Sequence, residues 1–123
     1  MKPKERPILE NIVKDDTLEI ESFQNKTLRP IIKMQHEILI ACFNNYLEEK
    51  KIKLLDLSVS QKLNKIKSIL IKDNSFKKLI FGVIIAHFSL SELSFYFKNK
   101  REVHRRITNI TIQRLQDTLI HKK

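Results

Sequence analysis

Glycine and proline are almost missing from the sequence. Its 123 residues include one glycine, Gly82, and three prolines, all of them at or before Pro30. Tight turns between strands depend on these residue types, and a sheet of several strands needs several such turns. The scarcity therefore argues against a β-rich fold. We expect an all-α protein, a compact bundle of about five helices without a sheet.

Cysteine and long hydrophobic runs are also scarce. Cys42 is the single cysteine, so no internal disulfide can form, and its place on the apolar face of a predicted helix indicates a buried hydrophobe. The longest apolar run, residues 79–88, contains Gly82 and His87 and is far shorter than the roughly 18 residues of a membrane span. No secretory leader is recognisable. We expect no membrane partner and a cytoplasmic location.

Acidic side chains are in the minority, and their distribution is uneven. The chain has 24 basic and 14 acidic residues, a formal net charge of +10. Residues 1–25 hold four basic and six acidic side chains (net −2), residues 26–97 twelve and six (net +6), and residues 98–123 eight and two (net +6). A basic body indicates a polyanionic partner, with nucleic acid first among them. Abundant lysine is also typical of AT-rich genomes, so arginine is the better indicator.

Residues 1–21 are expected to form an acidic, poorly anchored N-terminal arm, and residues 22–123 a single helical domain. The arm is either solvated or folds over the basic body, where it would compete with an anionic partner. The main helix is expected at residues 27–47, with Thr27 as its N-cap and Pro30 in its first turn, where proline is tolerated.

Start signals divide the rest of the chain. Ser58 and Gln61 form the capping-box pattern, which predicts a helix ending near Lys72. One of the residues 73–75 should cap the next helix. Two further helices are expected, one from Glu92 to about Lys98 with Ser89 or Ser91 as its cap, and one from Arg101 to about Ile120.

The segment at residues 76–88 is apolar nearly all round from Leu79 to Phe88, as in a helix buried among others. Gly82 lies within it, and glycine costs a helix about 1 kcal/mol relative to alanine. We therefore expect Gly82 to permit close approach of the main helix. A leucine there should overpack the core and destabilise the fold by about 1–3 kcal/mol. His87, alone in this run, is expected to be a core residue.

No pattern in the sequence predicts a metal, a cofactor or a catalytic centre. His36 and Glu37 are adjacent and point about 100° apart on a helix, so they cannot chelate together. The H-E-x-x-H, C-x-x-C and G-x-S-x-G motifs are absent from the sequence, and a single glycine cannot build a phosphate-binding loop. The residues favour a binding protein over an enzyme.

The one concentrated signal is a basic cluster at the junction of two predicted helices. Arg101 and Arg105 are one helical turn apart and could bind successive phosphates. The neighbouring aromatic residues 95–97 would then stack on unpaired bases. The alternative is that these rings belong to the core and that the basic residues form only a solvated helix start. Arg106 could instead turn inward and pair with Glu92 or Asp73. The candidate nucleic-acid-binding residues are Lys98, Lys100, Arg101, Arg105 and Arg106.

Several short motifs resemble a group of small all-helical bacterial proteins commonly labelled glyoxalase, over roughly residues 23–119. They are FQNKTLRPIIKMQ at 23–35, Lys72, Asp73 and Phe76, Leu79 with GVII at 82–85, RITN at 106–109, and Arg114, Leu115 and Gln116. The chain departs from the group at Ala86, where the group has glycine, and in its more basic residues 98–106. The resemblance implies a helical domain in the bacterial cytosol, and its label implies a lyase.

Taken together, the sequence leads to a ranked set of functions. The first is a non-enzymatic module that binds RNA or a ribonucleoprotein such as the ribosome through the basic cluster. The alternative is a protein–protein adaptor or homodimer that uses apolar surface near residues 95–97. The lyase of the group's label is a remote third possibility, because the sequence supplies neither the strands nor the histidine and glutamate ligands of metal-dependent glyoxalases.

Overall fold

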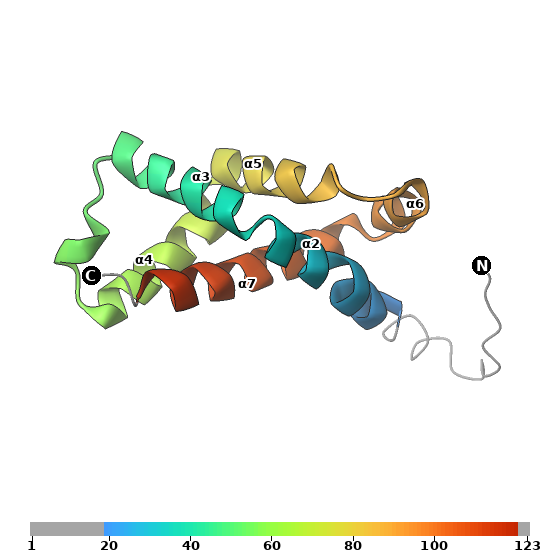
Figure 1. Cartoon of the computed structure of the whole chain (residues 1–123), viewed down its shortest axis with the longest axis horizontal. Coiled ribbons are helices and arrows are strands. Elements are labelled where there is room, and N and C mark those ends of the chain that lie inside the picture. Colours follow the sequence, from blue (N-terminus) through green and yellow to red (C-terminus); the bar gives the residue numbers. More distant parts are fainter. Residues whose placement is uncertain (1–18, 121–123) are drawn as a thin grey trace.

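The computed structural model describes residues 19–120, and these residues are almost entirely helical, with no strand among them. The predicted all-α fold is confirmed. One π-helical and one 3-10 segment accompany six α-helices (Figure 1): η1 (Gln24–Leu28), α2 (Arg29–Met34), α3 (His36–Glu49), η2 (Leu54–Asp56), α4 (Val59–Lys72), α5 (Asn74–Ile85), α6 (Leu90–Lys98) and α7 (Lys100–Leu119).

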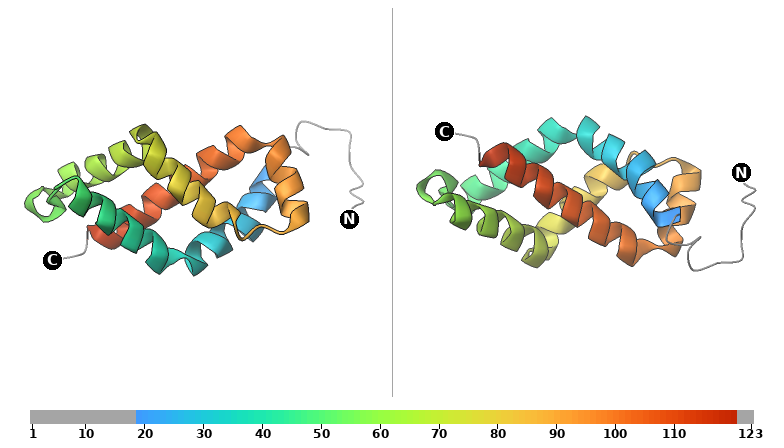
Figure 2. Two further views of the ribbon diagram at one scale, coloured as in Figure 1. Left: turned by 90° about the horizontal axis from the view of Figure 1, so that it is seen from above. Right: turned by 90° about the horizontal axis from the view of Figure 1, so that it is seen from below.

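The helices form an elongated bundle built around α7. This longest helix runs along most of the molecule and contacts η1, α2, α4, α5 and α6 (Figures 1 and 2). Helices α3 and α5 lie together, joined by edge-to-face and tilted contacts of Phe76 with Phe43 and Tyr46. Helix α6 closes one end of the bundle, and the connection between α3 and α4 forms the other.

The core is a continuous apolar cluster to which every α-helix contributes. On α7 the fully buried residues Val103, Ile107, Thr111 and Leu115 recur every four positions, so one side of the helix faces the interior. Burying each large aliphatic side chain of this kind stabilises the fold by about 1.5–3 kcal/mol. The centre of the bundle is therefore α7, rather than the helix expected at residues 27–47.

The expected main helix is longer at its start and is divided. Residues 19–23 are already helical, so Thr27 is not an N-cap; it is buried, and its hydroxyl donates to the Glu92 carboxylate at 3.1 Å. A bend at Gln35 (φ −94°, ψ 16°) separates α2 from α3, which explains why six α-helices are found where about five were predicted.

The π-helical segment gives a physical reason for tolerating Pro30. Within an α-helix, proline removes one hydrogen bond and its ring clashes with the carbonyl four residues earlier. Here the helix widens just before Pro30, and the Arg29 N–H bonds to the Gln24 carbonyl five residues back. The proline thus sits at the start of α2, in a helix that continues through it.

Unlike the predicted cap at Thr27, the start signals of α4, α5 and α6 are confirmed. The Gln61 N–H donates to Ser58 Oγ at 3.2 Å, and the Ser58 N–H donates to Gln61 Oε1 at 3.0 Å, a complete capping box. Asp73 caps α5 through the Phe76 N–H, and Ser89 rather than Ser91 caps α6. These bonds satisfy amides that a helix start leaves without partners.

The burial predicted for α5 is wrong. Its buried residues, Phe76, Ile80 and Ile84, form a single stripe, while Leu79 is 49% exposed and His87 is exposed as well. Gly82 is exposed, and a Cβ added there would meet no atom within 4 Å. Helix α5 lies on the outside of the bundle, so no helix approaches Gly82 and a leucine there would not overpack the core.

The domain begins before residue 22. Ile20 and Phe23 are both buried in the core, so residues 19–21 belong to the helical domain instead of the predicted arm. The remainder of that arm, residues 1–18, lies outside the described residues. Cys42 packs against the core but is only partly buried.

Candidate nucleic-acid interface

The predicted basic cluster lies at a sharp corner between α6 and α7. Asn99 alone separates the two helices, with φ −133° and ψ 33°, and its side-chain amide donates to the Phe95 carbonyl at 2.8 Å. This bond caps the end of α6 while α7 starts at the next residue. Lys98, Lys100 and Arg101 consequently project from both sides of one corner, and all three are exposed.

Glu102 neutralises part of the cluster. Arg105 binds this carboxylate through two nitrogens, and Arg106 Nε lies 2.7 Å from Glu102 Oε2. The hydrogen bonds from Arg105 and Arg106 lower the pKa of Glu102 to about 2. The carboxylate is therefore charged at neutral pH, and it holds both guanidinium groups in place.

Arg106 has a structural position. Its side chain is 15% exposed, and Nη1 donates to Gln24 Oε1 at 3.2 Å, which ties α7 to η1. The predicted pairing of Arg106 with Glu92 or Asp73 is wrong. Glu102 sits one turn before Arg106 on the same helix, so the pair forms without bringing distant segments together.

The exposed cations at the corner fall into two groups. Lys98, Lys100 and Arg101 have no carboxylate partner among residues 19–120. Arg101 and Arg105 lie one turn apart on the solvent side of α7, as predicted, but Arg105 is shared with Glu102. Three cations without a carboxylate partner in the described chain thus face solvent together with one guanidinium that is already bound to Glu102.

The sequence left open whether the three aromatic residues of α6 pack in the core or are exposed for stacking on bases, and both cases occur. Phe95 stacks on Phe23 with a centroid distance of 4.6 Å, and Tyr96 is buried. Phe97 is 61% exposed, and Lys100 Nζ lies 5.8 Å from its ring centroid. The core thus takes two of the rings, and Phe97 remains available with a cation beside it.

His104, within the basic cluster, does not add charge to it at neutral pH. Its ring lies parallel to Phe81, at a centroid distance of 4.1 Å, and Nε2 is 2.6 Å from the Tyr96 hydroxyl. Burial lowers the pKa of His104, and the positive charges of Lys100 and Lys77 lower it further. The neutral ring packs the start of α7 against α5.

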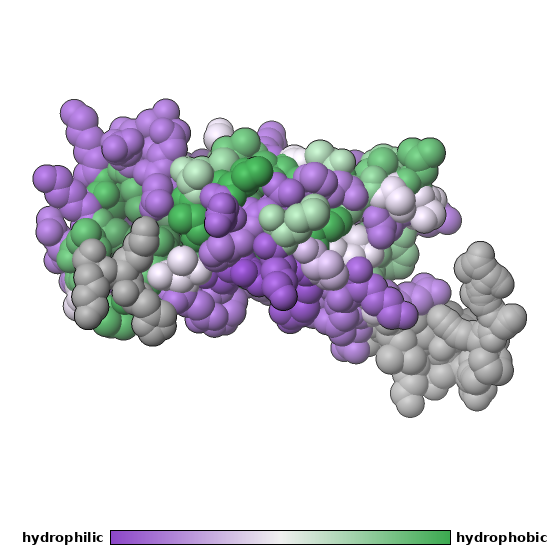
Figure 3. All heavy atoms as spheres, in the orientation of Figure 1, coloured by the Kyte–Doolittle hydropathy of each residue, from purple (hydrophilic) through white to green (hydrophobic). Residues whose placement is uncertain are grey.

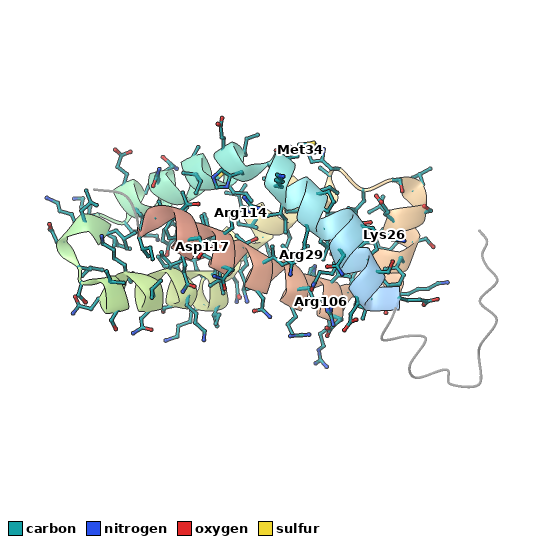
Figure 4. The ribbon with its side chains drawn as sticks, turned by 60° about the horizontal axis from the view of Figure 1, so that its bottom comes forward. Lys26, Arg29, Met34, Arg106, Arg114 and Asp117 are labelled. Carbon is teal, nitrogen blue, oxygen red and sulfur yellow. The ribbon has the colours of Figure 1, made fainter. Side chains whose placement is uncertain are left out.

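A second basic surface lies where α2 and α7 run side by side, and Figure 4 labels Arg29 and Arg114 on it. A groove of about 370 Å³ there is lined by Asn25, Arg29, Pro30, Lys33, Ile110 and Arg114. The sequence analysis did not identify it. The four-residue spacing of Asn25, Arg29 and Lys33 was the available signal, but Arg114 joins them only in the folded chain.

Other kinds of site find no support in the described part of the chain. It contains no group of three or more histidine, cysteine or carboxylate side chains placed to hold a metal ion. His36 contacts Arg114, with 3.2 Å between Nδ1 and Nη1. A cavity of about 700 Å³ lies at the end of the bundle opposite the α6–α7 corner and is lined mainly by apolar residues such as Leu47, Leu54 and Leu119. No helix within residues 19–120 has the length and apolar character required to cross a membrane.

Comparison of the chain with protein-family models, with curated proteins and with solved structures gave no match.

Proposed function

We propose that this chain is a basic, non-enzymatic binding module that docks on single-stranded RNA through the corner between α6 and α7, within a cytoplasmic ribonucleoprotein such as the ribosome. The observation that carries the proposal is the exposed ring of Phe97 beside three cations without carboxylate partners in the described chain: Lys98, Lys100 and Arg101. Proteins that bind single strands combine cations that follow the backbone with aromatic rings on which bases stack.

The mechanism is phosphate neutralisation with little reading of base identity. Lys98, Lys100 and Arg101 replace condensed counterions at successive phosphates, and the release of those ions drives association. Phe97 offers one face for stacking, which every base can use. Arg105 joins only when a phosphate competes with Glu102, so it contributes less than the other three cations.

Fluorescence anisotropy with a labelled single-stranded RNA, measured over a range of salt concentrations, tests the proposal. The triple variant Lys98→Gln, Lys100→Gln, Arg101→Gln should weaken binding and lower the slope of log K against log salt by about 2, because each single-strand phosphate contact contributes about 0.7. Phe97→Ala should cost about 1–3 kcal/mol of binding free energy through lost stacking.

A matched control removes the same charge elsewhere. Lys50, Lys51 and Lys53 are exposed in the connection between α3 and α4, at the other end of the bundle. Replacing all three by glutamine should leave the affinity within about twofold after correction for net charge. Binding that does not depend on salt, no binding to total RNA at low salt, or an equal loss in the control variant would each contradict the proposal.

A homodimer or protein adaptor is the second candidate, favoured by the apolar surface of α6. Leu90 is 85% exposed and Phe97 61%, and in Figure 3 apolar side chains gather at the α6 end of the molecule and over α3 and α5. Sedimentation velocity across protein concentrations tests it. A dimer that Leu90→Ser dissociates while RNA binding is unchanged would support an apolar interface in addition to the basic corner, and a strict monomer would exclude the homodimer.

A further inference from the structure

Arg114, in the middle of α7, carries a charge that no described residue balances. Its Nη1 lies 3.2 Å from His36 Nδ1, and because a guanidinium only donates, the imidazole nitrogen must accept. Its Nε is buried and has no hydrogen-bond partner in the described part of the chain. None of the ion pairs among residues 19–120 involves Arg114. Among residues 19–120, the His36 imidazole is thus the one group that holds this cation through a hydrogen bond.

The groove beside Arg114 adds further positive charge. Arg29 and Lys33 line its other wall from consecutive turns of α2, and both are exposed. Asn25 Oδ1 accepts from Arg29 Nε at 3.3 Å, which directs that guanidinium along the helix. All of the charged residues that line the groove are basic.

Such an arrangement is costly unless an anion completes it. A buried donor without an acceptor costs about 1–3 kcal/mol, and a partly desolvated cation without a counter-charge costs more. Three cations from two helices that converge on one hollow also repel one another. An oxyanion in the groove would supply acceptor oxygens to Arg114 and offset all three charges.

We propose that the groove between α2 and α7 is a binding site for a phosphoryl group, with Arg114 as the main ligand and Arg29 and Lys33 at the rim. Three positive charges match a phosphate dianion better than a single carboxylate, which would leave two of them unbalanced. The planar fork of a guanidinium also fits two phosphate oxygens at once.

This site is separate from the corner between α6 and α7. Arg114 lies thirteen positions after Arg101 on α7, which is about 20 Å along the helix axis, and the two sites share no residue. The phosphoryl group can therefore come from a free phosphate or from the phosphorylated end of an RNA. The chemistry of the groove is the same for either source.

Arginine Nε–H resonances in a ¹H–¹⁵N spectrum of the full chain report directly on the groove. Titration with inorganic phosphate at constant ionic strength should shift the Arg114 Nε–H resonance to saturation, while sodium acetate over the same range should leave it in place. Arg114→Met should weaken phosphate binding at least tenfold, as followed through the Arg29 Nε–H resonance. The matched control Arg101→Met removes the same charge from the exposed side of α7 and should change the affinity less than twofold.

Two further arms make the test decisive. If Arg114→Met does not fold, Arg29→Met, a substitution at an exposed rim position, should still weaken binding severalfold. A short RNA with a 5′-phosphate, compared with the same RNA ending in a 5′-hydroxyl, identifies the source: tighter binding of the phosphorylated RNA assigns the groove to an RNA end, and equal binding of the two RNAs assigns it to free phosphate.

The proposal is overturned if phosphate leaves the Arg114 resonance unchanged, if acetate shifts it as strongly, or if Arg101→Met loses as much affinity as Arg114→Met. The triple variant at the α6–α7 corner should keep its phosphate site intact. Failure of the groove and failure of the RNA-binding corner can therefore be told apart.

Discussion

Gly82→Ala should stabilise this protein, and the reason lies in the surroundings of α5. Gly82 occupies an interior turn of this helix, where glycine is unfavourable because it loses more backbone freedom on folding than any other residue. Glycine would be required here only if a neighbouring helix occupied the position of a side chain. Apart from the backbone of its own helix turns and its two chain neighbours, no described atom lies within 4 Å of the position that a Cβ would take, so alanine adds no clash.

The size of the effect follows from helix propensity alone. Alanine is more favourable than glycine in a helix interior by about 0.5–1 kcal/mol. For a folded domain of roughly 100 residues, 1 kcal/mol corresponds to about 4–8 °C in Tm. Gly82→Ala should therefore raise Tm by about 2–8 °C, and Gly82→Leu should raise it as well rather than overpack the core.

Urea denaturation followed by circular dichroism measures this directly, and the m value should stay constant. The reciprocal variant Ala41→Gly changes an exposed interior position of α3 and should lose a similar amount. Since the two sites lie on different helices and share no described contact, the double variant should return close to wild-type stability. A Gly82→Ala protein that is less stable than wild type would refute the reasoning, because it would mean that this face of α5 is covered in solution.

Four shorter predictions concern polar groups. Thr111→Val should raise the free energy of unfolding by about 1 kcal/mol in urea melts, because the fully buried Thr111 hydroxyl has no hydrogen-bond partner. Burial lowers the pKa of His104 below the usual value of about 6.5. The contribution of this ring to the free energy of unfolding should therefore be constant above pH 6.5 and should be lost as the pH falls from there through the folded-state pKa. His104→Gln should flatten this pH dependence. A carbon-detected NMR titration should give Glu102 a pKa of about 2, and Arg105→Gln should raise it by removing the strongest contribution. Asp73→Ala should cost about 1–3 kcal/mol in the same melts, because it removes both the N-cap of α5 and the acceptor of the Tyr46 hydroxyl.

The features that sequence reasoning predicted well depend on short stretches of chain. The capping box of Ser58 and Gln61 involves residues three positions apart, so its geometry is settled within one turn. The scarcity of glycine and proline excluded a sheet for an equally simple reason. Helix starts and fold class were therefore predictable before any contact between helices was known.

The features that it missed depend on which helix covers which face. The segment at residues 76–88 has more apolar residues than α5 buries, and nothing local reveals that Leu79 and Gly82 face solvent. The same is true of the basic residues. Arg29 and Arg114 are far apart in sequence and meet only because α2 lies along α7, and Arg106 pairs within its own helix rather than across the bundle.

The π-helical segment of η1 also corrects the phase between two apolar stripes. Leu28 lies eight positions after Ile20, and in a regular α-helix eight steps of 100° would leave their side chains about 80° apart. The widened turn absorbs one extra residue, so both side chains are buried in the same core. Deleting Asn25 would leave seven steps between them, or 700° in a regular α-helix, so Ile20 and Leu28 would stay within about 20° of one another while the hydrogen-bond ladder became regular. The extra residue is thus accommodated in η1 without moving either side chain out of the core.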